Sequence, residues 1–424
     1  MRRKSQEYTA DSGNSDVFWE AKQDGKKRKK VLMLASVASM IDQFNLPNID
    51  LLCQMGYEVH VACNFREGNT CSVKRVCKLQ KKLRDMHVIW YQWDCPRDIC
   101  ALARCRKAYR QLLELFANHA FAWIHCHSPI GGALARLAAH KAKIPVIYTA
   151  HGFHFYKGAP LKNRILYYSV EKLLAYWTDI LITVNQEDYR FAERYLKAGK
   201  VFYIPGIGID IEQLQTRMRT GSCDNMYFRR KYKIPEHALL LLSVGELSRR
   251  KNHRIVIAAL SALRRKDVYY LICGQGPLCQ ELWKYAKSLG VADRVRMPGY
   301  QEELEQVYQN ADIFVFPSIQ EGMPVALMEA MAAGLPCVVS DIRGNRELIA
   351  RAGGARFGLG HPQQIKQLNR ALWQLIQDKK RRDLCGAYNR KKVEAYDLSV
   401  VLRRMKTIYA GMMSSSSVRE SKCR

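Results

Sequence analysis

Short apolar runs alternate with amphipathic stretches in two separate parts of the chain. In the first part, runs of strand length occur at Val31–Ser36, Glu58–Cys63, His87–Trp90, Ala122–His125, Pro145–Thr149 and Ile180–Val184. Between them, apolar residues recur at helical spacing at Leu46–Met55, Ile99–Phe116, Leu161–Trp177 and Gln186–Leu196. Strands that alternate with helices predict βαβ units, and hence a mainly parallel sheet covered on both faces.

The alternation stops at the segment IPGIGID (Ile204–Asp210) and resumes after a polar stretch. One proline and two glycines interrupt regular structure there, which predicts a hinge between two domains. The second series has strand patterns at Leu239–Val244, Val268–Cys273, Val295–Met297, Ile313–Phe316 and Cys337–Val339, and helical patterns at Ile255–Leu263, Gln280–Leu289, Leu304–Gln309 and Pro324–Ala333. We therefore predict an α/β fold of two doubly wound, Rossmann-like domains that face each other across a cleft.

The same patterns divide the chain into five segments. We predict a flexible basic N-terminus (1–28), a first domain (29–204), a second domain (205–390), a C-terminal helix that packs back on the first domain (391–413) and a disordered tail (414–424). No apolar run approaches the roughly 18 residues that span a bilayer. The basic run Lys26–Lys30 has no apolar segment behind it, so no secretory signal is expected.

Cysteine and charge narrow the class of protein further. The 14 cysteines include no CxxC pair, and many lie within apolar runs, which indicates free thiols in a reducing cytosol. The net charge of +29 is compatible with a nucleic acid, an anionic membrane, a phosphate-bearing substrate or simply a solvated basic surface. The cations form separate clusters without interleaved aromatic residues, so we expect no nucleic-acid groove. Attraction to the anionic inner face of the membrane, worth about 1 kcal/mol per cation, fits the excess better.

The segment Ile313–Asp341 carries the clearest chemical signal. A strand ends before a loop that holds Glu321, and a helix begins near Pro324 and ends at Gly334. Free backbone N–H groups at Gly322 and Met323, together with the helix dipole, would form an anion site suited to a diphosphate.

Two carboxylates in this segment match the length of a nucleotide diphosphate. Glu321 and Glu329 are eight positions apart, which is at most about 12 Å in a helix. A carboxylate accepts two hydrogen bonds from neighbouring hydroxyls, as found on ribose and hexoses. Glu321 could instead be an exposed loop acid. Glu329 has apolar neighbours, and an unpaired buried carboxylate there would be costly, which favours a binding role.

These residues resemble the E-x7-E signature of family-four retaining glycosyltransferases with the GT-B fold. The resemblance extends over most of the chain: HGFH at His151–His154, TVNQEDY at Thr183–Tyr189, IPGIGID at Ile204–Asp210, SVGELSRRKN at Ser243–Asn252, GQGPL at Gly274–Leu278 and PGY at Pro298–Tyr300. Each motif alone is weak, but their order and spacing together are specific. The sequence as a whole is similar to those of bacterial capsular and exopolysaccharide glycosyltransferases.

The resemblance implies roles for individual residues. The first domain would hold the acceptor, and the second the nucleotide sugar. Glu321 would contact the donor sugar, Glu329 the ribose and Lys251 the diphosphate, where it would neutralise charge on the leaving phosphate. His151 follows a predicted strand and would lie beside the reacting sugar. We therefore expect His151, Lys251 and Glu321 to be catalytic, although Lys251 could be a solvated lysine and His151 could merely shape its loop.

Further residues complete the expected site. The expected donor contacts also include Gly245, Arg249, Arg250, Gly274, Tyr300, Gly322, Met323, Pro324 and Glu329. For Gly274 the alternative is a tight backbone turn. The expected acceptor contacts are Ser39, Asp42, Asn45 and His154.

The sequence departs from the family pattern in two places. The family often has an arginine directly after the glycine that precedes the diphosphate lysine, and here that position is Glu246. Arg249 or Arg250 would substitute, or fewer cations would hold the diphosphate. The glycine pair that often follows the first strand is replaced by Ala38–Asp42, which makes Ser39 and Asp42 candidates for the acceptor instead.

The resemblance implies transfer, with retention, of a UDP-linked hexose or N-acetylhexosamine to a hydroxyl of a glycan or lipid-linked acceptor in polysaccharide biosynthesis. No DxD triplet occurs, so we expect metal-independent transfer without a cofactor. The alternatives are a GT-B-like epimerase or phosphorylase, a catalytically inactive scaffold, and a basic protein that binds nucleic acid.

Overall fold

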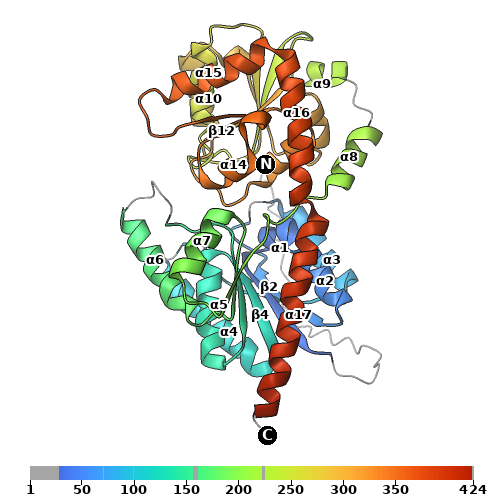
Figure 1. The fold of residues 1–424 in the computed structure, drawn as a ribbon, viewed down its shortest axis with the longest axis vertical. Coiled ribbons are helices and arrows are strands. Elements are labelled where there is room, and N and C mark those ends of the chain that lie inside the picture. Colours follow the sequence, from blue (N-terminus) through green and yellow to red (C-terminus); the bar gives the residue numbers. More distant parts are fainter. Residues whose placement is uncertain (1–27, 70, 99, 156–160, 222–224, 423–424) are drawn as a thin grey trace, which may run out of the picture.

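The chain forms two α/β units, one above the other in Figure 1. The computed structural model describes residues 28–69, 71–98, 100–155, 161–221 and 225–422. The N-terminal segment that the sequence predicts to be flexible therefore lies outside the described residues, apart from Arg28.

The first unit is built on a seven-stranded parallel sheet with the order β3-β2-β1-β4-β5-β6-β7. The strands are β1 (Lys30–Val37), β2 (Glu58–Asn64), β3 (Ile89–Gln92), β4 (Phe121–His127), β5 (Val146–Ala150), β6 (Ile180–Thr183) and β7 (Lys200–Tyr203). The helices are α1 (Ala38–Phe44), α2 (Leu46–Gln54), α3 (Val73–Asp85), α4 (Leu102–Asn118), α5 (Pro129–Ala142), α6 (Leu161–Ala175) and α7 (Gln186–Tyr195).

The second unit repeats this arrangement with six parallel strands in the order β10-β9-β8-β11-β12-β13. The strands are β8 (Leu239–Val244), β9 (Val268–Cys273), β10 (Val295–Gly299), β11 (Ile313–Phe316), β12 (Cys337–Ser340) and β13 (Gly354–Phe357). The helices are α8 (Ile211–Thr220), α9 (Asn225–Lys231), α10 (His253–Ala262), α11 (Cys279–Ser288), α12 (Glu305–Gln309), α13 (Val325–Ala332), α14 (Arg343–Leu348), α15 (Gln364–Gln377) and α16 (Lys379–Val393).

The strands are continuous apolar runs in the sequence because their residues are buried on both faces of the sheet. Six successive residues of β1 are buried, as are the last five of β8. Helices on both faces of a parallel sheet leave no solvated side, so alternation disappears. In each sheet the strand order reverses next to the central strand, between β1 and β4 and between β8 and β11. Loops at such a reversal diverge and leave a crevice at the carboxyl ends of the strands.

The last helix, α17 (Leu398–Lys422), runs from the second unit down across the first (Figure 1). Its Tyr409 hydroxyl lies 3.0 Å from Nδ1 of His125 in β4, and the Tyr409 ring stacks on Trp123. At the start of α17, Leu398 donates a backbone hydrogen bond to Ile209 in the IPGIGID segment. The two connections between the units are thereby bound to each other.

Two segments differ from the sequence-based expectations. Residues 414–422 continue α17, where the sequence predicts a disordered tail. Extending a packed helix avoids the nucleation cost that an isolated serine-rich segment would face. Residues Ala38–Phe44, which lie in none of the predicted elements, form α1 directly after β1. Within the residues that the structure describes, no helix is both long and apolar enough to cross a bilayer.

Candidate active site

Glu321 lies in the loop between β11 and α13 and is held by two cations. Lys251 Nζ and Arg250 NH1 each lie 2.8 Å from the same oxygen, Glu321 Oε1. Only 10% of the Glu321 side chain is exposed, which rules out the exposed loop acid considered from the sequence. Burial would raise the pKa of Glu321, but Lys251 and Arg250 outweigh it and hold the pKa below its usual value. Glu321 is therefore ionised at neutral pH.

The side chain of Lys251 passes close to Gly245 on its way to Glu321. A Cβ atom at Gly245, whose φ is +153°, would lie 3.1 Å from Cε of Lys251. The ammonium group also lies 4.6 Å from the centre of the Phe316 ring. Burial lowers the pKa of Lys251, while Glu321 opposes this shift. The lysine is thus a partly desolvated cation and not the fully solvated side chain that the sequence left open.

The loops of the two units touch at a pair of glycines. A Cβ atom at Gly322 would lie 1.8 Å from the carbonyl oxygen of His151, and one at Gly152 would lie 2.9 Å from Cα of Gly322. Gly152 also has a φ of +126°, which disfavours other residues. Glycine at both positions lets the His151 loop and the Glu321 loop meet backbone to backbone.

A cavity of about 220 Å³ opens beside this contact. Its walls include five residues that the sequence predicts for the site: His151, His154, Arg250, Glu321 and Gly322. The sequence did not single out the remaining lining residues, which are Met40, Ser128, Pro129, Tyr148, Gly152, Phe153, Tyr167, Glu171, Gln320 and Arg343. Both units therefore contribute to one cavity, as the resemblance implied.

His151 ends a row of three histidines, of which His125 and His127 are buried. Its Nε2 lies 3.0 Å from Nδ1 of His127, and the rings of His127 and His125 lie 4.2 Å apart. Burial lowers the pKa of His151 to about 4 and that of His125 to about 3, and it lowers the pKa of His127 well below its usual value. All three imidazoles are neutral at neutral pH, so His151 can exchange hydrogen bonds with a hydroxyl without carrying charge.

The wall that the first unit contributes to the cavity contains a buried ion pair. Arg136 NH1 lies 2.9 Å from Glu171 Oε2, and the Tyr148 hydroxyl donates to the other carboxylate oxygen at 3.0 Å. The Arg136 guanidinium also stacks on the Tyr148 ring at 3.8 Å. Glu171 and Tyr148 line the cavity, so this wall is polar and fixed in place.

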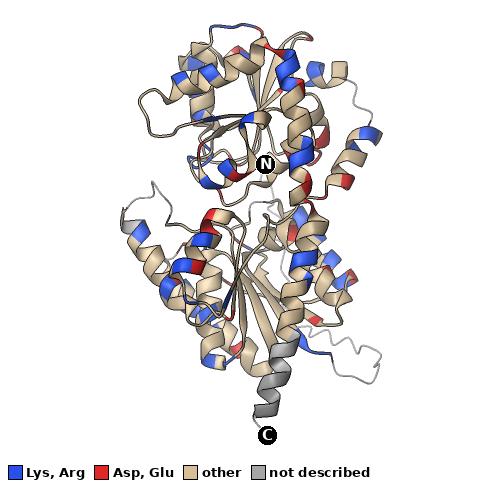
Figure 2. Ribbon diagram, viewed as in Figure 1, with Lys and Arg blue, Asp and Glu red and all other residues tan. Residues whose placement is uncertain are grey.

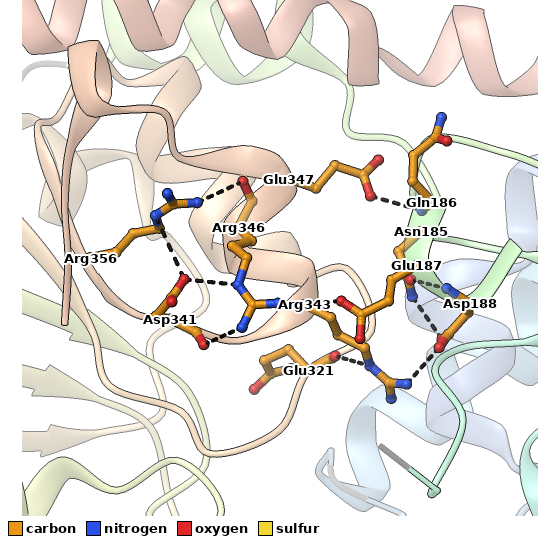
Figure 3. A network of polar contacts seen from close by, with 10 residues as sticks. All are labelled: Asn185, Gln186, Glu187, Asp188, Glu321, Asp341, Arg343, Arg346, Glu347 and Arg356. Carbon is orange, nitrogen blue, oxygen red and sulfur yellow. Dashed lines mark hydrogen bonds and ion pairs between the residues drawn. The ribbon is translucent and has the colours of Figure 1, made fainter. Parts of the chain in front are cut away.

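Arg343, at the start of α14, joins three segments of the site. Its NH1 donates to Asp188 Oδ1 at 2.6 Å, its NH2 to the Phe153 carbonyl and its Nε to the Glu321 carbonyl at 3.1 Å. Figure 3 shows Arg343 between the Glu321 loop and the start of α7. Asp188 is itself held by Asn185 Nδ2 at 2.8 Å. This arginine therefore fixes the Glu321 loop against the first unit.

A second contact between the same helices lies beside Arg343 in Figure 3. Glu347 accepts hydrogen bonds from the backbone N–H of Gln186 at 2.8 Å and from the Tyr203 hydroxyl at 2.6 Å. Arg346 reaches Glu187 at 3.4 Å in a solvent-exposed ion pair. The sequence motif TVNQEDY was noted without a role, and it supplies most of these partners.

The second carboxylate of the E-x7-E pattern lies away from this cavity. Glu329 accepts a hydrogen bond from the Tyr308 hydroxyl at 2.8 Å, and burial raises its pKa although Tyr308 opposes the shift. The buried carboxylate therefore has a protein partner for Oε2. Gly334, with a φ of +80°, follows the end of α13 as expected.

The predicted acceptor residues in α1 and at its C-terminal end make contacts within the protein. Asp42 pairs with Arg75 at 2.5 Å, and Arg75 also donates to the Tyr300 hydroxyl of the second unit. Asn45 is buried and its Nδ2 donates to the Met40 carbonyl. Ser39 is also buried, and its backbone N–H donates to Asn69. Met40 is the α1 residue that lines the cavity.

The other predicted donor residues surround the Glu321 loop or the ends of β8 and β9. A Cβ atom at Gly274 would lie 1.8 Å from the Gly245 carbonyl, so Gly274 allows a tight backbone turn. Arg249 is exposed, while Met323 is buried and Pro324 precedes the first turn of α13. Within the described part of the chain, no cluster of three or more His, Cys, Asp or Glu side chains could hold a metal ion.

The fold and the site define a class of protein: two Rossmann-like domains face each other, with two cations, a helix amino end and a neutral histidine beside the cavity between them. Comparison with known proteins makes the class specific. Residues 49–213 match the family described as Glycosyltransferase Family 4, and residues 225–392 match Glycosyl transferases group 1. A protein of Bacillus subtilis (strain 168) that is named "Putative glycosyltransferase EpsD" is 36% identical over 76% of this chain and 81% of its own length.

A second relative, at lower identity, is also named as a glycosyltransferase, and a solved structure has a similar fold. An Escherichia coli enzyme named UDP-Gal:alpha-D-GlcNAc-diphosphoundecaprenol alpha-1,3-galactosyltransferase is 27% identical over 75% of this chain and 80% of its own length. The crystal structure of Anabaena HepE in complex with UDP and glucose superposes with a TM-score of 0.69, at 17% identity, over 92% of this chain and 100% of that chain.

The chain belongs to the family-four glycosyltransferases and has the GT-B fold. It is a glycosyltransferase of polysaccharide or glycan biosynthesis. The predicted family, fold class and enzyme class are thereby confirmed.

Proposed function

We propose that the protein transfers a hexose or N-acetylhexosamine, with retention of anomeric configuration, from a UDP-linked donor to a hydroxyl of a glycan or lipid-linked acceptor. The observation that carries the proposal is the convergence of Lys251 and Arg250 on Glu321, opposite His151 in one cavity. Support for the substrates comes from the relative named for UDP-galactose and a diphosphoundecaprenol acceptor, and from the UDP and glucose bound to the similar structure.

The donor-side roles follow from charge. Lys251 and Arg250 would neutralise the diphosphate as the sugar leaves, aided by the backbone N–H groups of Gly322 and Met323 before α13. Arg250 then supplies the second cation that Glu246 does not. Glu321 would accept hydrogen bonds from sugar hydroxyls, and Glu329, fixed through one oxygen by Tyr308, would accept from the ribose. Gly245, Gly274 and Tyr300 would shape the nucleotide side.

We favour front-face transfer over double displacement. In this step the bond between the anomeric carbon and the phosphate oxygen breaks, and the acceptor oxygen bonds to that carbon from the same side. The acceptor proton passes to the leaving phosphate. Glu321 is a poor nucleophile for the other route because two cations already share its carboxylate. His151 would orient a hydroxyl of the reacting sugar, and His154 the acceptor.

Two cations at the diphosphate also make a metal ion unnecessary, so we propose metal-independent transfer without a cofactor. The net charge of +29 favours a protein that works at the anionic inner face of the cell membrane and is not directed to nucleic acid. The product would be a repeat unit of a capsule or exopolysaccharide.

Release of free UDP tests the proposal. UDP-glucose, UDP-galactose and their N-acetylamino forms are supplied with and without a diphosphate-linked N-acetylglucosamine lipid, and with or without a chelator. Release should require both one donor and the acceptor and should persist with the chelator. NMR of the product should show the donor's anomeric configuration. Release that ignores the acceptor would indicate a hydrolase, and conversion of one UDP-sugar into another without net UDP release would indicate an epimerase. An inverted product would exclude the retaining route.

A further inference from the structure

Helix α6 presents an unusually apolar face to solvent. Among the described side chains, the exposed residues of α6 and the following position are Leu161, Arg164, Ile165, Leu166, Ser169, Lys172, Leu173 and Tyr176. Five of these eight are apolar or aromatic, with exposed fractions between 48% for Leu166 and 68% for Leu161. A surface helix normally turns polar residues outward, so this face indicates a covering partner. Figure 1 places α6 at the outer edge of the first unit.

The exposed charged residues among the described side chains of α6 are cations, which are blue in Figure 2. Arg164 and Lys172 are exposed on α6, and Lys197 Nζ lies 5.8 Å from the centre of the Tyr176 ring. The one acid among the described side chains of α6, Glu171, is buried on the opposite face. Leucine and isoleucine beside a tyrosine and flanking cations are the composition of helices that lie in a membrane interface. Cations at the edge also favour anionic headgroups over an uncharged protein surface.

The opposite face of the same helix belongs to the enzyme's cavity. Tyr167 and Glu171 line it, and Glu171 is fixed by Arg136 and Tyr148. One helix therefore joins the apolar exposed face to the wall that the first unit contributes to the cavity. A sugar carried on a lipid would have to reach this wall while its lipid remains in the bilayer.

We propose that the exposed face of α6 (Leu161, Ile165, Leu166, Leu173 and Tyr176) inserts into the surface of an anionic membrane and thereby brings the cavity to a lipid-linked acceptor. The membrane contact is an independent claim, whereas its purpose rests on the proposed transferase function. It gives the charge-based membrane association a defined surface and adds an apolar contribution that salt does not screen.

Vesicle co-sedimentation tests the proposal with the full chain and vesicles of equal parts phosphatidylcholine and phosphatidylglycerol. The double variant Leu166→Gln/Leu173→Gln should bind at least about tenfold more weakly, because two side chains lose their transfer from water to the interface. Leu384→Gln, on α16 of the second unit, changes a leucine that is 64% exposed and should bind like the wild type. Because all three residues are exposed, the variants should fold, which circular dichroism checks.

The salt dependence and the mass of the protein complete the test. Wild-type binding should fall with salt but remain above that of the double variant throughout. Equal binding of the two proteins, or no wild-type binding at low salt, would overturn the proposal. It would also be overturned by a wild-type dimer that the double variant abolishes, because a second copy would then cover the face. Thermal stabilisation by UDP-sugars should be the same in all variants. Its loss everywhere would remove the proposed donor and leave the membrane result standing.

Discussion

Arg343 donates a hydrogen bond to Asp188 across the two domains, at 2.6 Å between NH1 and Oδ1. Both side chains are at most 6% exposed. The same guanidinium holds the carbonyl groups of Phe153 and Glu321, so one residue fixes both walls of the cleft. Arg343 is thus a positioning residue for the Glu321 loop.

Arg343→Met should lower kcat while leaving donor binding nearly unchanged, because the diphosphate cations remain in place. Breaking a buried pair leaves Asp188 without its charge partner, so the free energy of unfolding should fall by about 3 kcal/mol. Steady-state kinetics and urea unfolding measure the two effects. Arg346→Gln is the control, because its ion pair with Glu187 is exposed and should contribute less than about 1 kcal/mol. Equal losses in both variants would contradict a special role for Arg343.

The two carboxylates of the E-x7-E pattern should separate nucleotide from sugar recognition. Glu329→Ala should weaken binding of UDP itself by about tenfold, the effect of one lost hydrogen bond to a charged group. Glu321→Ala should leave UDP binding intact, since it frees Lys251 and Arg250, but should reduce discrimination between UDP-sugars. Titration calorimetry with UDP and several UDP-sugars measures both. Glu303→Ala, at an exposed acid, is the control. Equal, negligible effects would refute both assignments.

Acid should destabilise the protein through its buried histidines. Burial lowers the pKa of His151 to about 4 from 6.5, so between these values the unfolded chain binds a proton that the folded protein does not. Stability therefore falls as the pH decreases through this window. One such group contributes about 2 kcal/mol of loss between pH 7 and 5. His151→Gln should reduce the loss by that amount in urea unfolding, whereas the exposed His361→Gln should not.

The sequence predicted the buried strands better than the edges of the sheets. Leu239–Val244 and Val268–Cys273 match the observed strands residue for residue, because both are apolar runs with a sharp polar boundary. By contrast, β7 and β13 were not predicted, since each is a four-residue strand at the sheet edge with exposed positions. Helix α1 was missed because only seven residues without a side-chain cap form it.

The sequence likewise predicted some features of the site and missed others. The sequence could place Lys251 and Glu321 in one site, because both residues lie in recognisable motifs that follow strand ends, but it did not predict their ion pair. The bond between Arg343 and Asp188 joins residues 155 positions apart in different domains. No local pattern encodes such a contact, because it depends on how closely the domains approach. Tyr148 and Glu171 were missed for a similar reason, since their packing makes them part of the wall.

The close approach of the two domains should depend on the absence of a side chain at Gly322. A methyl group there would lie 1.8 Å from the His151 carbonyl oxygen, a separation that only movement of the two loops can relieve. Gly322→Ala should therefore hold the cleft partly open, increase the radius of gyration in small-angle scattering and reduce kcat, while each domain keeps its fold. Gly411→Ala is the control, because nothing lies within 4 Å of the added methyl group and alanine favours a helix. If Gly322→Ala is as compact and active as the control, contact between the His151 and Glu321 loops is not required for transfer.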